Sequence, residues 1–171
     1  MDILGRIGRA GRFWGFCRAR GRVWLFADAD GSTDGDSLNR LAEEVLAGAD
    51  AAIGSRWLPD SIVPLRQPWP RRLASRVFNR LVRLLFGWRI RDTQCGAKAF
   101  SADRLRPLLA HIKSRGWTFD VDVLWTLSRA CPDAVIREVP VRWSDSSGSR
   151  VRLHRDAPGM IWDLLKLRFG K

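Results

Sequence analysis

The chain has 171 residues, of which 46% are hydrophobic, so it is long enough to bury the core of one domain. It contains no run of about 18 apolar residues, which excludes a membrane-spanning helix, and we expect no secretory signal because the N-terminus lacks an apolar stretch. The formal net charge is +12, and all but four of the 30 basic residues are arginine. Such a charge predicts an anionic partner: a nucleotide, a nucleic acid or an acidic lipid.

The spacing of the cysteines does not indicate disulfide bonds or a metal site. Cys17, Cys95 and Cys131 are widely spaced and none belongs to a CxxC pair. This pattern predicts neither a disulfide scaffold nor a zinc site, and it favours a reducing, cytoplasmic setting.

Residues 1–22 are rich in Gly and Arg, and we expect no more than a short helix in this segment. The apolar run 23–27 predicts a buried strand. A helix over 36–47 follows, because its apolar residues recur at helical spacing. The short apolar run 51–54 predicts a second strand, and a loop that contains prolines comes after it.

Predicted helices and strands continue to alternate in the second half of the chain. Pro70 is predicted to begin a long helix and Gly87 to end it. A turn leads into a short strand within 92–100, and a further strand over 134–143 contains Pro140, which indicates a sheet edge or a strand end. Strands that alternate with helices predict an α/β domain. The other predicted helices span 102–112, 121–130 and 158–168.

The long helix that begins at Pro70 carries two stripes, and they allow two interpretations. It is either an interfacial helix, whose apolar face meets acyl chains and whose arginines meet anionic headgroups, or an ordinary amphipathic helix packed on the sheet. The apolar stripe consists of Leu73, Val77, Leu81, Leu84 and Leu85, and the basic stripe of Arg72, Arg76, Arg80 and Arg83.

Two carboxylates follow the first predicted strand. Asp28 and Asp30 leave its end on the same side, because side chains alternate along a strand. Neighbouring carboxylates repel each other unless a cation lies between them, and Mg²⁺ prefers such oxygen ligands and often joins them to a substrate's phosphates. A strand followed by an Asp-rich turn is the alternative interpretation.

Five segments, in this order along the chain, resemble the polyprenyl-phosphate members of the family 2 glycosyltransferases. Each motif is weak by itself, but their order and spacing over residues 23–168 make the resemblance specific. The DTQCG run at 92–96 is most similar to the dolichyl-phosphate β-glucosyltransferases, and mannosyltransferases of the same class are related. The five segments are LFADADGST at 25–33, AIGSRW at 52–57, RDTQCGAKAF at 91–100, WTFDVDVL at 117–124 and EVPVRW at 138–143 with the GSR at 148–150.

The resemblance implies a GT-A fold, a Rossmann-like α/β arrangement, which here lacks the first β-α units together with the segment that grips the nucleotide's base. Residues 1–22 form a divergent N-terminal segment, and 23–168 form a partial catalytic domain. The implied reaction is the inverting transfer of a hexose from a nucleotide sugar, UDP-glucose in preference to GDP-mannose, to a polyprenyl or dolichyl phosphate.

The resemblance also implies roles for particular residues. Asp28 and Asp30 match the Asp-x-Asp motif that holds Mg²⁺ or Mn²⁺ against the donor diphosphate, so Asp30 also serves catalysis there. Asp92 is expected near the donor sugar and the acceptor, as a second catalytic residue, whereas Asp120 is expected to cap the following helix. Residues expected to bind phosphate or sugar are Arg56, Arg71, Arg72, Gln94, Asp122 and Arg150.

The implied partners are the nucleotide sugar, the lipid phosphate and the anionic surface of the inner face of the membrane, with association into homo-oligomers left open. Two other hypotheses remain. One is a catalytically inactive fragment or scaffold that docks on a membrane. The other is a basic nucleic-acid-binding module, which the charge favours but which leaves Asp28 and Asp30 unexplained, so we expect no nucleic-acid partner.

Overall fold

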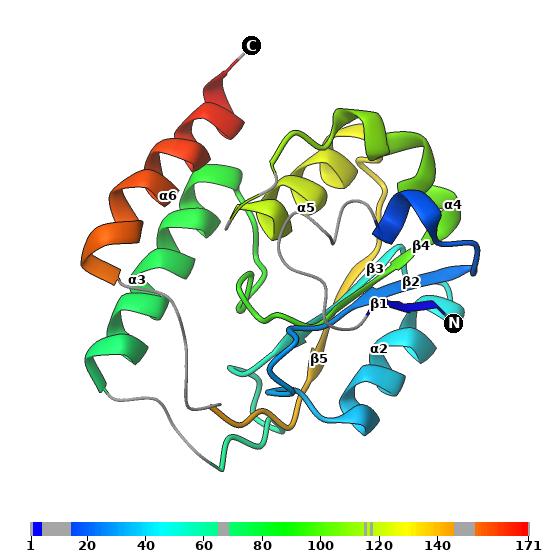
Figure 1. Cartoon of the computed structure of the whole chain (residues 1–171), viewed down its shortest axis with the longest axis horizontal. Helices are drawn as coiled ribbons and strands as arrows, with labels where there is room; N and C mark the ends of the chain where they lie inside the picture. Colours follow the sequence, from blue (N-terminus) through cyan, green and yellow to red (C-terminus); the bar gives the residue numbers. More distant parts are fainter. Residues whose placement is uncertain are drawn as a thin grey trace.

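The computed structural model describes residues 2–4, 15–64, 69–114, 116, 118–145 and 153–170. Within these residues the chain forms one mixed sheet in the strand order β1-β2-β4-β3-β5, with helices on both of its faces (Figure 1). The α/β class is therefore confirmed. The strands are β1 (Asp2–Leu4), β2 (Val23–Phe26), β3 (Ala51–Ser55), β4 (Lys98–Ser101) and β5 (Ile136–Pro140).

The sheet combines parallel and antiparallel pairs. β4 lies between β2 and β3 and is antiparallel to both, whereas β1 is parallel to β2 and β5 is parallel to β3. β5 therefore forms one edge, as Pro140 indicates, because a proline cannot donate a hydrogen bond within a sheet. The strand at 2–4 was not expected from the sequence.

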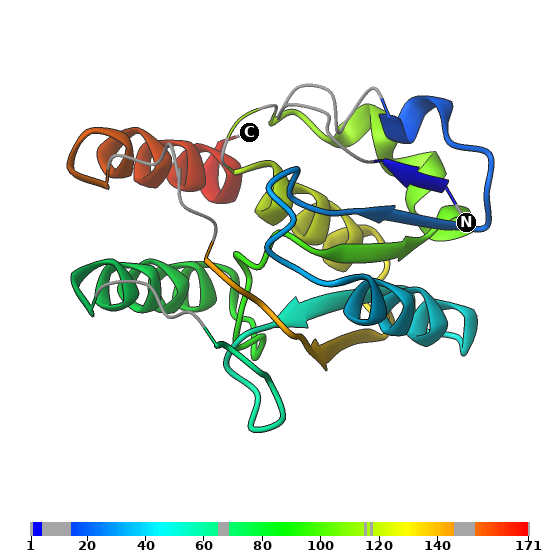
Figure 2. The same cartoon turned by 60° about the horizontal axis from the view of Figure 1, so that its bottom comes forward.

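Two apolar layers enclose the sheet. Helix α2 (Gly35–Leu46) covers one face, and helix α5 (Phe119–Ala130) covers the other (Figures 1 and 2). Side chains of β2 alternate between the layers, so that Leu25 packs toward α2 and Phe26 packs toward α5, and all four residues of the strand are buried. Burial on both faces explains why this strand is an uninterrupted apolar run.

The helix predicted over 102–112 is divided in the structure. Helix α4 (Ala102–Leu105) is followed by a 3₁₀ segment, η1 (Arg106–His111). Pro107 lies at the junction and has no N–H to continue the α-helical hydrogen bonds, which gives a physical reason for the change.

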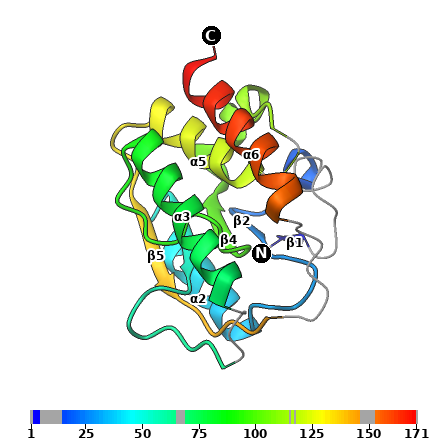
Figure 3. The ribbon, with the colours of Figure 1, turned by 90° about the vertical axis from the view of Figure 1, so that its left-hand side faces the viewer.

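Helices α3 (Trp69–Phe86) and α6 (Leu153–Phe169) lie side by side and extend beyond the sheet (Figures 1, 2 and 3). α6 begins earlier than predicted and contains Pro158. Their contact is a separate apolar cluster in which Val82 and Phe86 of α3 meet Leu164 of α6. No helix in the described part of the chain is long and apolar enough to cross a membrane.

The apolar stripe of α3 does not face the sheet. Leu73, Val77 and Leu84 are 54%, 61% and 72% exposed, while the helix instead buries Asn79, Val82 and Phe86. Leu81 and Leu85 are half-buried, and Leu85 packs against the cluster that contains Val82 and Phe86. The helix therefore does not pack on the sheet through that stripe, and Leu73, Val77 and Leu84 form an outward surface.

Candidate active site

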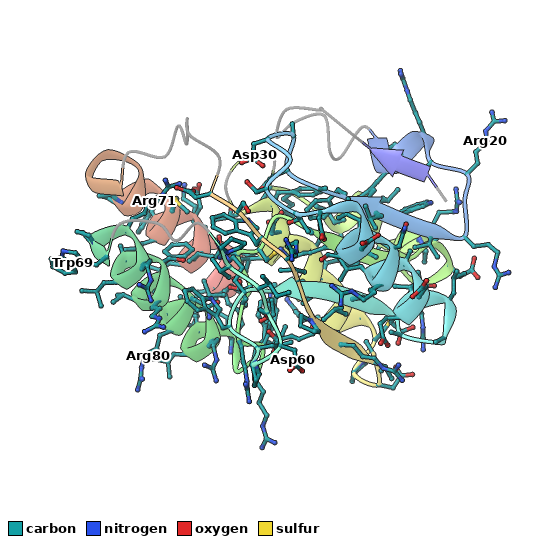
Figure 4. The ribbon with its side chains drawn as sticks, turned by 90° about the horizontal axis from the view of Figure 1, so that it is seen from below. Arg20, Asp30, Asp60, Trp69, Arg71 and Arg80 are labelled. Atoms are coloured by element: carbon teal, nitrogen blue, oxygen red, sulfur yellow. The ribbon has the colours of Figure 1, made fainter. Side chains whose placement is uncertain are left out.

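The two carboxylates of the Asp-x-Asp motif lie in the exposed loop after β2 (Figure 4). The backbone N–H of Ser32 donates to Oδ1 of Asp30 at 3.0 Å, which holds the turn that follows the strand. The carboxylate of Asp28 rests on Gly96, where a Cβ atom would lie only 1.8 Å from Asp28 Oδ2. Glycine is therefore required at position 96 for the carboxylate to occupy this position.

Arg56 and Asp92 form a buried, two-pronged ion pair. Nε and Nη2 of Arg56 donate to the two carboxylate oxygens of Asp92 at 2.7 and 2.9 Å, and the backbone N–H of Arg56 donates to Oδ2 at 3.0 Å. The Asp92 side chain is completely buried, and that of Arg56 is 12% exposed. Arg56 directly follows β3, so the pair joins the end of this strand to the turn before β4.

The ion pair determines the protonation of both groups. Burial is the largest single influence and disfavours the charged forms, but the neighbouring charges and the hydrogen bonds between the partners together outweigh it. The pKa of Asp92 consequently lies below its ordinary value of 3.8, and the pKa of Arg56 is raised, with a contribution from the nearby Asp28 carboxylate. Asp92 is ionised at neutral pH, and both of its carboxylate oxygens already accept hydrogen bonds from Arg56. Such a group is better suited to position Arg56 than to accept a proton.

Two further polar residues hold the turn that carries Asp92. Oε1 of Glu138, on β5, accepts the backbone N–H of Asp92 at 3.0 Å. Oδ1 of Asn79, on α3, accepts both the N–H and the hydroxyl of Thr93, at 2.9 and 2.6 Å, and its Nδ2 donates to the carbonyl of Arg91. No role was predicted for either residue, although Glu138 begins one of the matched segments. For Asn79, the available signal was a single amide in a helix made mostly of apolar residues and arginines.

A pocket of about 260 Å³ opens beside Arg56, between the loop after β3 and helix α3. Its walls combine three arginines with two tryptophans, which suits an anionic group attached to an apolar one. The Arg56 guanidinium lies 5.7 Å from the ring centroid of Trp57 and 5.2 Å from that of Trp143. The lining residues are Arg56, Trp57, Leu58, Pro59, Ser61, Val63, Arg72, Arg76 and Trp143.

The structure brings only some of the predicted arginines to this pocket. Arg72 lines it together with Arg76, whose guanidinium lies 4.9 Å from the Trp57 centroid. Arg71 instead forms an ion pair with Asp145 at 3.7 Å. Arg76 belonged to the predicted basic stripe, but no phosphate-binding role was predicted for it.

Other predicted residues lie next to the ion pair or away from it. Gln94 is half-buried; its N–H approaches Oδ1 of Asp92 at 3.3 Å, and its side-chain amide approaches the hydroxyl of Thr93 at 3.4 Å. Trp117, which belongs to one of the matched segments, and Arg150 lie outside the described residues.

Asp122 and Asp120 have roles different from those expected. Oδ2 of Asp122 accepts the backbone N–H groups of Lys113 and Ser114 at 2.8 and 2.6 Å. Because this buried carboxylate holds a backbone segment and does not line the pocket, the expectation that it binds substrate is corrected. Asp120 is not the cap of α5, which is Thr118; it pairs with Lys98 at 3.2 Å.

The loop after β2 fits part of a divalent-metal site. Two carboxylates supply hard oxygen ligands of the kind that Mg²⁺ and Mn²⁺ prefer, and Gly96 provides space beside one of them. Among the described residues no group of three or more His, Cys, Asp or Glu side chains could hold an ion. An ion bound by Asp28 and Asp30 would therefore take further ligands from a diphosphate or from water.

The fold is that of the GT-A glycosyltransferases. Two solved structures of glucosyl-3-phosphoglycerate synthase from Mycobacterium tuberculosis match it with TM-scores of 0.62 and 0.63, covering 95% and 98% of this chain and 56% of theirs. Sequence identity is 18% and 15%. One was solved with Mn²⁺, UDP and glucosyl-3-phosphoglycerate, and the other with Mg²⁺ and UDP.

No protein-family model matches the chain. Curated relatives do match. The chain is 38% identical to glycosyltransferase AglD of Haloferax volcanii over 166 residues, which cover 96% of the chain and 26% of the relative. It is 35% identical to the polyprenol monophosphomannose synthase of Mycolicibacterium smegmatis (87% of the chain, 58% of the relative). It is 31% identical to the dolichyl-phosphate β-glucosyltransferase of Saccharomyces cerevisiae (91% and 50%).

The chain belongs to the family 2 glycosyltransferases. It spans about half the length of the mycobacterial and yeast relatives and about a quarter of the archaeal one.

Proposed function

We propose that this chain carries the site of an inverting hexosyltransferase that moves a sugar from a nucleotide sugar to a polyprenyl or dolichyl phosphate. UDP-glucose is the favoured donor, and GDP-mannose is the alternative. The relatives are named for glucosyl and mannosyl transfer to such lipids, which supports the acceptor class but leaves the donor open.

One observation carries the proposal. Arg56 links the two candidate anion sites, because its charge interacts with the Asp28 carboxylate and its side chain lines the tryptophan-walled pocket. Asp92 holds the guanidinium in place through two hydrogen bonds. A donor diphosphate near Asp28 and Asp30 and an acceptor phosphate in the pocket would thus both lie near one fixed cation.

The chemistry needs little proton transfer. An oxygen of the acceptor phosphate attacks the anomeric carbon, the bond from that carbon to the diphosphate oxygen breaks, and the nucleoside diphosphate leaves with the electron pair, so that the configuration inverts. A phosphate is already ionised at neutral pH and requires no general base. Mg²⁺ or Mn²⁺ at Asp28 and Asp30 would supply positive charge for the leaving diphosphate. Arg56, Arg72 and Arg76 orient the anionic groups.

The same proposal places the chain on an anionic membrane surface through α3 and α6. The exposed apolar residues of these helices include Trp69, Leu73, Val77 and Trp162. Figure 4 shows Trp69, Arg71 and Arg80 on α3. An amphipathic pair of this kind suits the boundary between acyl chains and acidic headgroups. The lipid phosphate would then reach the pocket from that side, because Arg72 and Arg76 belong to α3.

The decisive experiment compares transfer of radiolabelled glucose from UDP-glucose with transfer of mannose from GDP-mannose to polyprenyl phosphate, with Mn²⁺ present. We expect lipid-linked product from one donor, and none from the Asp30→Ala variant. The matched control is Asp103→Ala, which removes an exposed carboxylate on α4 and is expected to retain full activity. Undiminished transfer by Asp30→Ala would refute the site. Vesicle binding without any transfer would favour the inactive scaffold.

A further inference from the structure

A buried ion pair lies between the start of β4 and helix α5, and the proposed reaction does not use it. Nζ of Lys98, on β4, donates to Oδ2 of Asp120, in the first turn of α5, at 3.2 Å. The Lys98 side chain has no exposed surface, and that of Asp120 is 10% exposed. Burial of two charges is costly and in many proteins adds no net stability, so the pair calls for another explanation.

Lys98 makes a second contact that joins the pair to the candidate site. Its Nζ donates to the carbonyl oxygen of Cys95 at 2.6 Å, which ties the start of β4 to the turn before it. Gly96 is the next residue of that turn, and its Cα supports the carboxylate of Asp28. Lys98 is also paired with Phe26 across the β2–β4 ladder, and Phe26 precedes Asp28 by two residues.

These contacts form a continuous path from the buried charge to a candidate metal ligand. Lys98 fixes the Cys95 carbonyl, the following peptide places Gly96, and Gly96 leaves just enough space for the Asp28 carboxylate. The Phe26 ring, whose centroid is 5.7 Å from Nζ, covers the ammonium group on the β2 side. A shift of the 95–96 backbone would therefore move Asp28 relative to Asp30.

We infer that Lys98 is a positioning residue for the divalent-metal and diphosphate site, with Asp120 as its counter-ion. The inference rests on the proposed function, because it assigns to Asp28 the role of a metal ligand. Residues that support a metal ligand without touching the metal commonly change metal affinity by 10- to 100-fold when they are altered.

The test measures the dissociation constant of Mn²⁺ in the presence of UDP, by titration calorimetry, together with the melting temperature. The variant is Lys98→Met combined with Asp120→Asn, which leaves no unpaired buried charge. We expect about tenfold weaker Mn²⁺ binding at a temperature where the variant is fully folded. The control, Arg104→Met, removes an ion pair with Asp50 at the opposite end of β3. It is expected to change the melting temperature but not the Mn²⁺ affinity.

A second variant keeps the inference testable if the double variant does not fold. Gly96→Ala adds a methyl group against Asp28 without touching the buried pair, and it should weaken Mn²⁺ binding to a similar degree. Unchanged Mn²⁺ affinity in a folded Lys98→Met/Asp120→Asn variant, or in Gly96→Ala, would overturn the inference while the proposed function stands. Wild-type protein that binds Mn²⁺ no better than Asp30→Ala would overturn both.

Discussion

Asp92 and Arg56 show how one side chain can place another. Both are buried, so each would be strongly destabilising without its partner, and their three hydrogen bonds offset the loss of water. The arrangement holds the Arg56 guanidinium in one position beside the pocket. Asp92 therefore positions Arg56, and its expected part in catalysis stays a prediction.

This pairing predicts a pH-dependent contribution to stability. Because the pKa of Asp92 is lower in the folded chain than its ordinary 3.8, the stabilisation is complete above that value and is lost as pH falls toward the folded-state pKa. We expect Asp92→Asn to lower the unfolding free energy by about 3–5 kcal/mol at pH 7, and by less at pH 3. Urea unfolding at the two pH values measures the difference. An equal loss at both would contradict the assignment.

The cysteines should differ in reactivity. Burial raises the pKa of the Cys95 thiol to about 11, so it is protonated and inaccessible at neutral pH, whereas Cys17 is exposed. In a titration with a thiol reagent at pH 8, we expect Cys17 to react promptly and Cys95 to react only after denaturant is added. Mass spectrometry of the labelled peptides identifies which residue has reacted. Rapid labelling of Cys95 in the native protein would show that the 92–98 turn opens readily.

Helices α3 and α6 are joined by contacts that leave their outer faces uncovered. The Arg168 guanidinium lies 5.1 Å from the Trp125 centroid, and its Nε donates to the Leu85 carbonyl near the end of α3 at 2.8 Å. Phe86 meets Trp125 edge to face at 5.0 Å. These contacts account for the inner faces of the two helices. We propose that the apolar residues that remain outside meet lipid.

The outward stripe of α3 can be tested by its effect on vesicle binding. Leu73→Ser combined with Val77→Ser removes apolar surface from the proposed membrane face, and we expect binding to vesicles containing acidic lipid to weaken by about tenfold or more. The melting temperature should change little, because both side chains are already exposed. Vesicle pelleting measures the binding. Leu46→Ser, an equally exposed position on α2, is the control and should bind normally.

The charged side chains of the candidate site lie at the ends of the strands. Asp28 follows β2, Arg56 follows β3, and the Asp92 turn comes before the antiparallel β4, so all three meet at one end of the sheet. Because these groups belong to segments far apart in the sequence, a ligand that contacts Asp28 and Arg56 together should stabilise the fold as a unit.

We therefore expect UDP with Mn²⁺ to raise the melting temperature of the chain. A ligand at one hundred times its dissociation constant contributes about 2.7 kcal/mol of stability. UDP with a chelator should have a much smaller effect, and UDP with Mn²⁺ should have no effect on Asp30→Ala. Thermal unfolding followed by circular dichroism measures the shift. An identical melting temperature with and without Mn²⁺ would contradict a metal-held diphosphate.

Much of the fold follows from local patterns. The apolar run of β2, the helical spacing in α2, and the Pro70 and Gly87 signals of α3 all place elements close to where the structure has them. The short β1, the 3₁₀ segment after α4 and the early start of α6 were not predictable in this way. Their residues have weak or mixed periodicity, and contacts with the rest of the fold determine their conformation.

By itself, the sequence determined the α/β class and the family, because these depend on the order and spacing of short motifs, and it singled out Asp28, Arg56 and Asp92 as candidate site residues. Only the tertiary structure decided what each charge does. Asp92 holds Arg56, Asp122 holds a backbone segment, Lys98 donates to the carbonyl of Cys95, and Leu73, Val77 and Leu84 of α3 face outward. The physical reason is that the role of a charged or apolar side chain depends on its neighbours in space, and these neighbours come from distant parts of the chain.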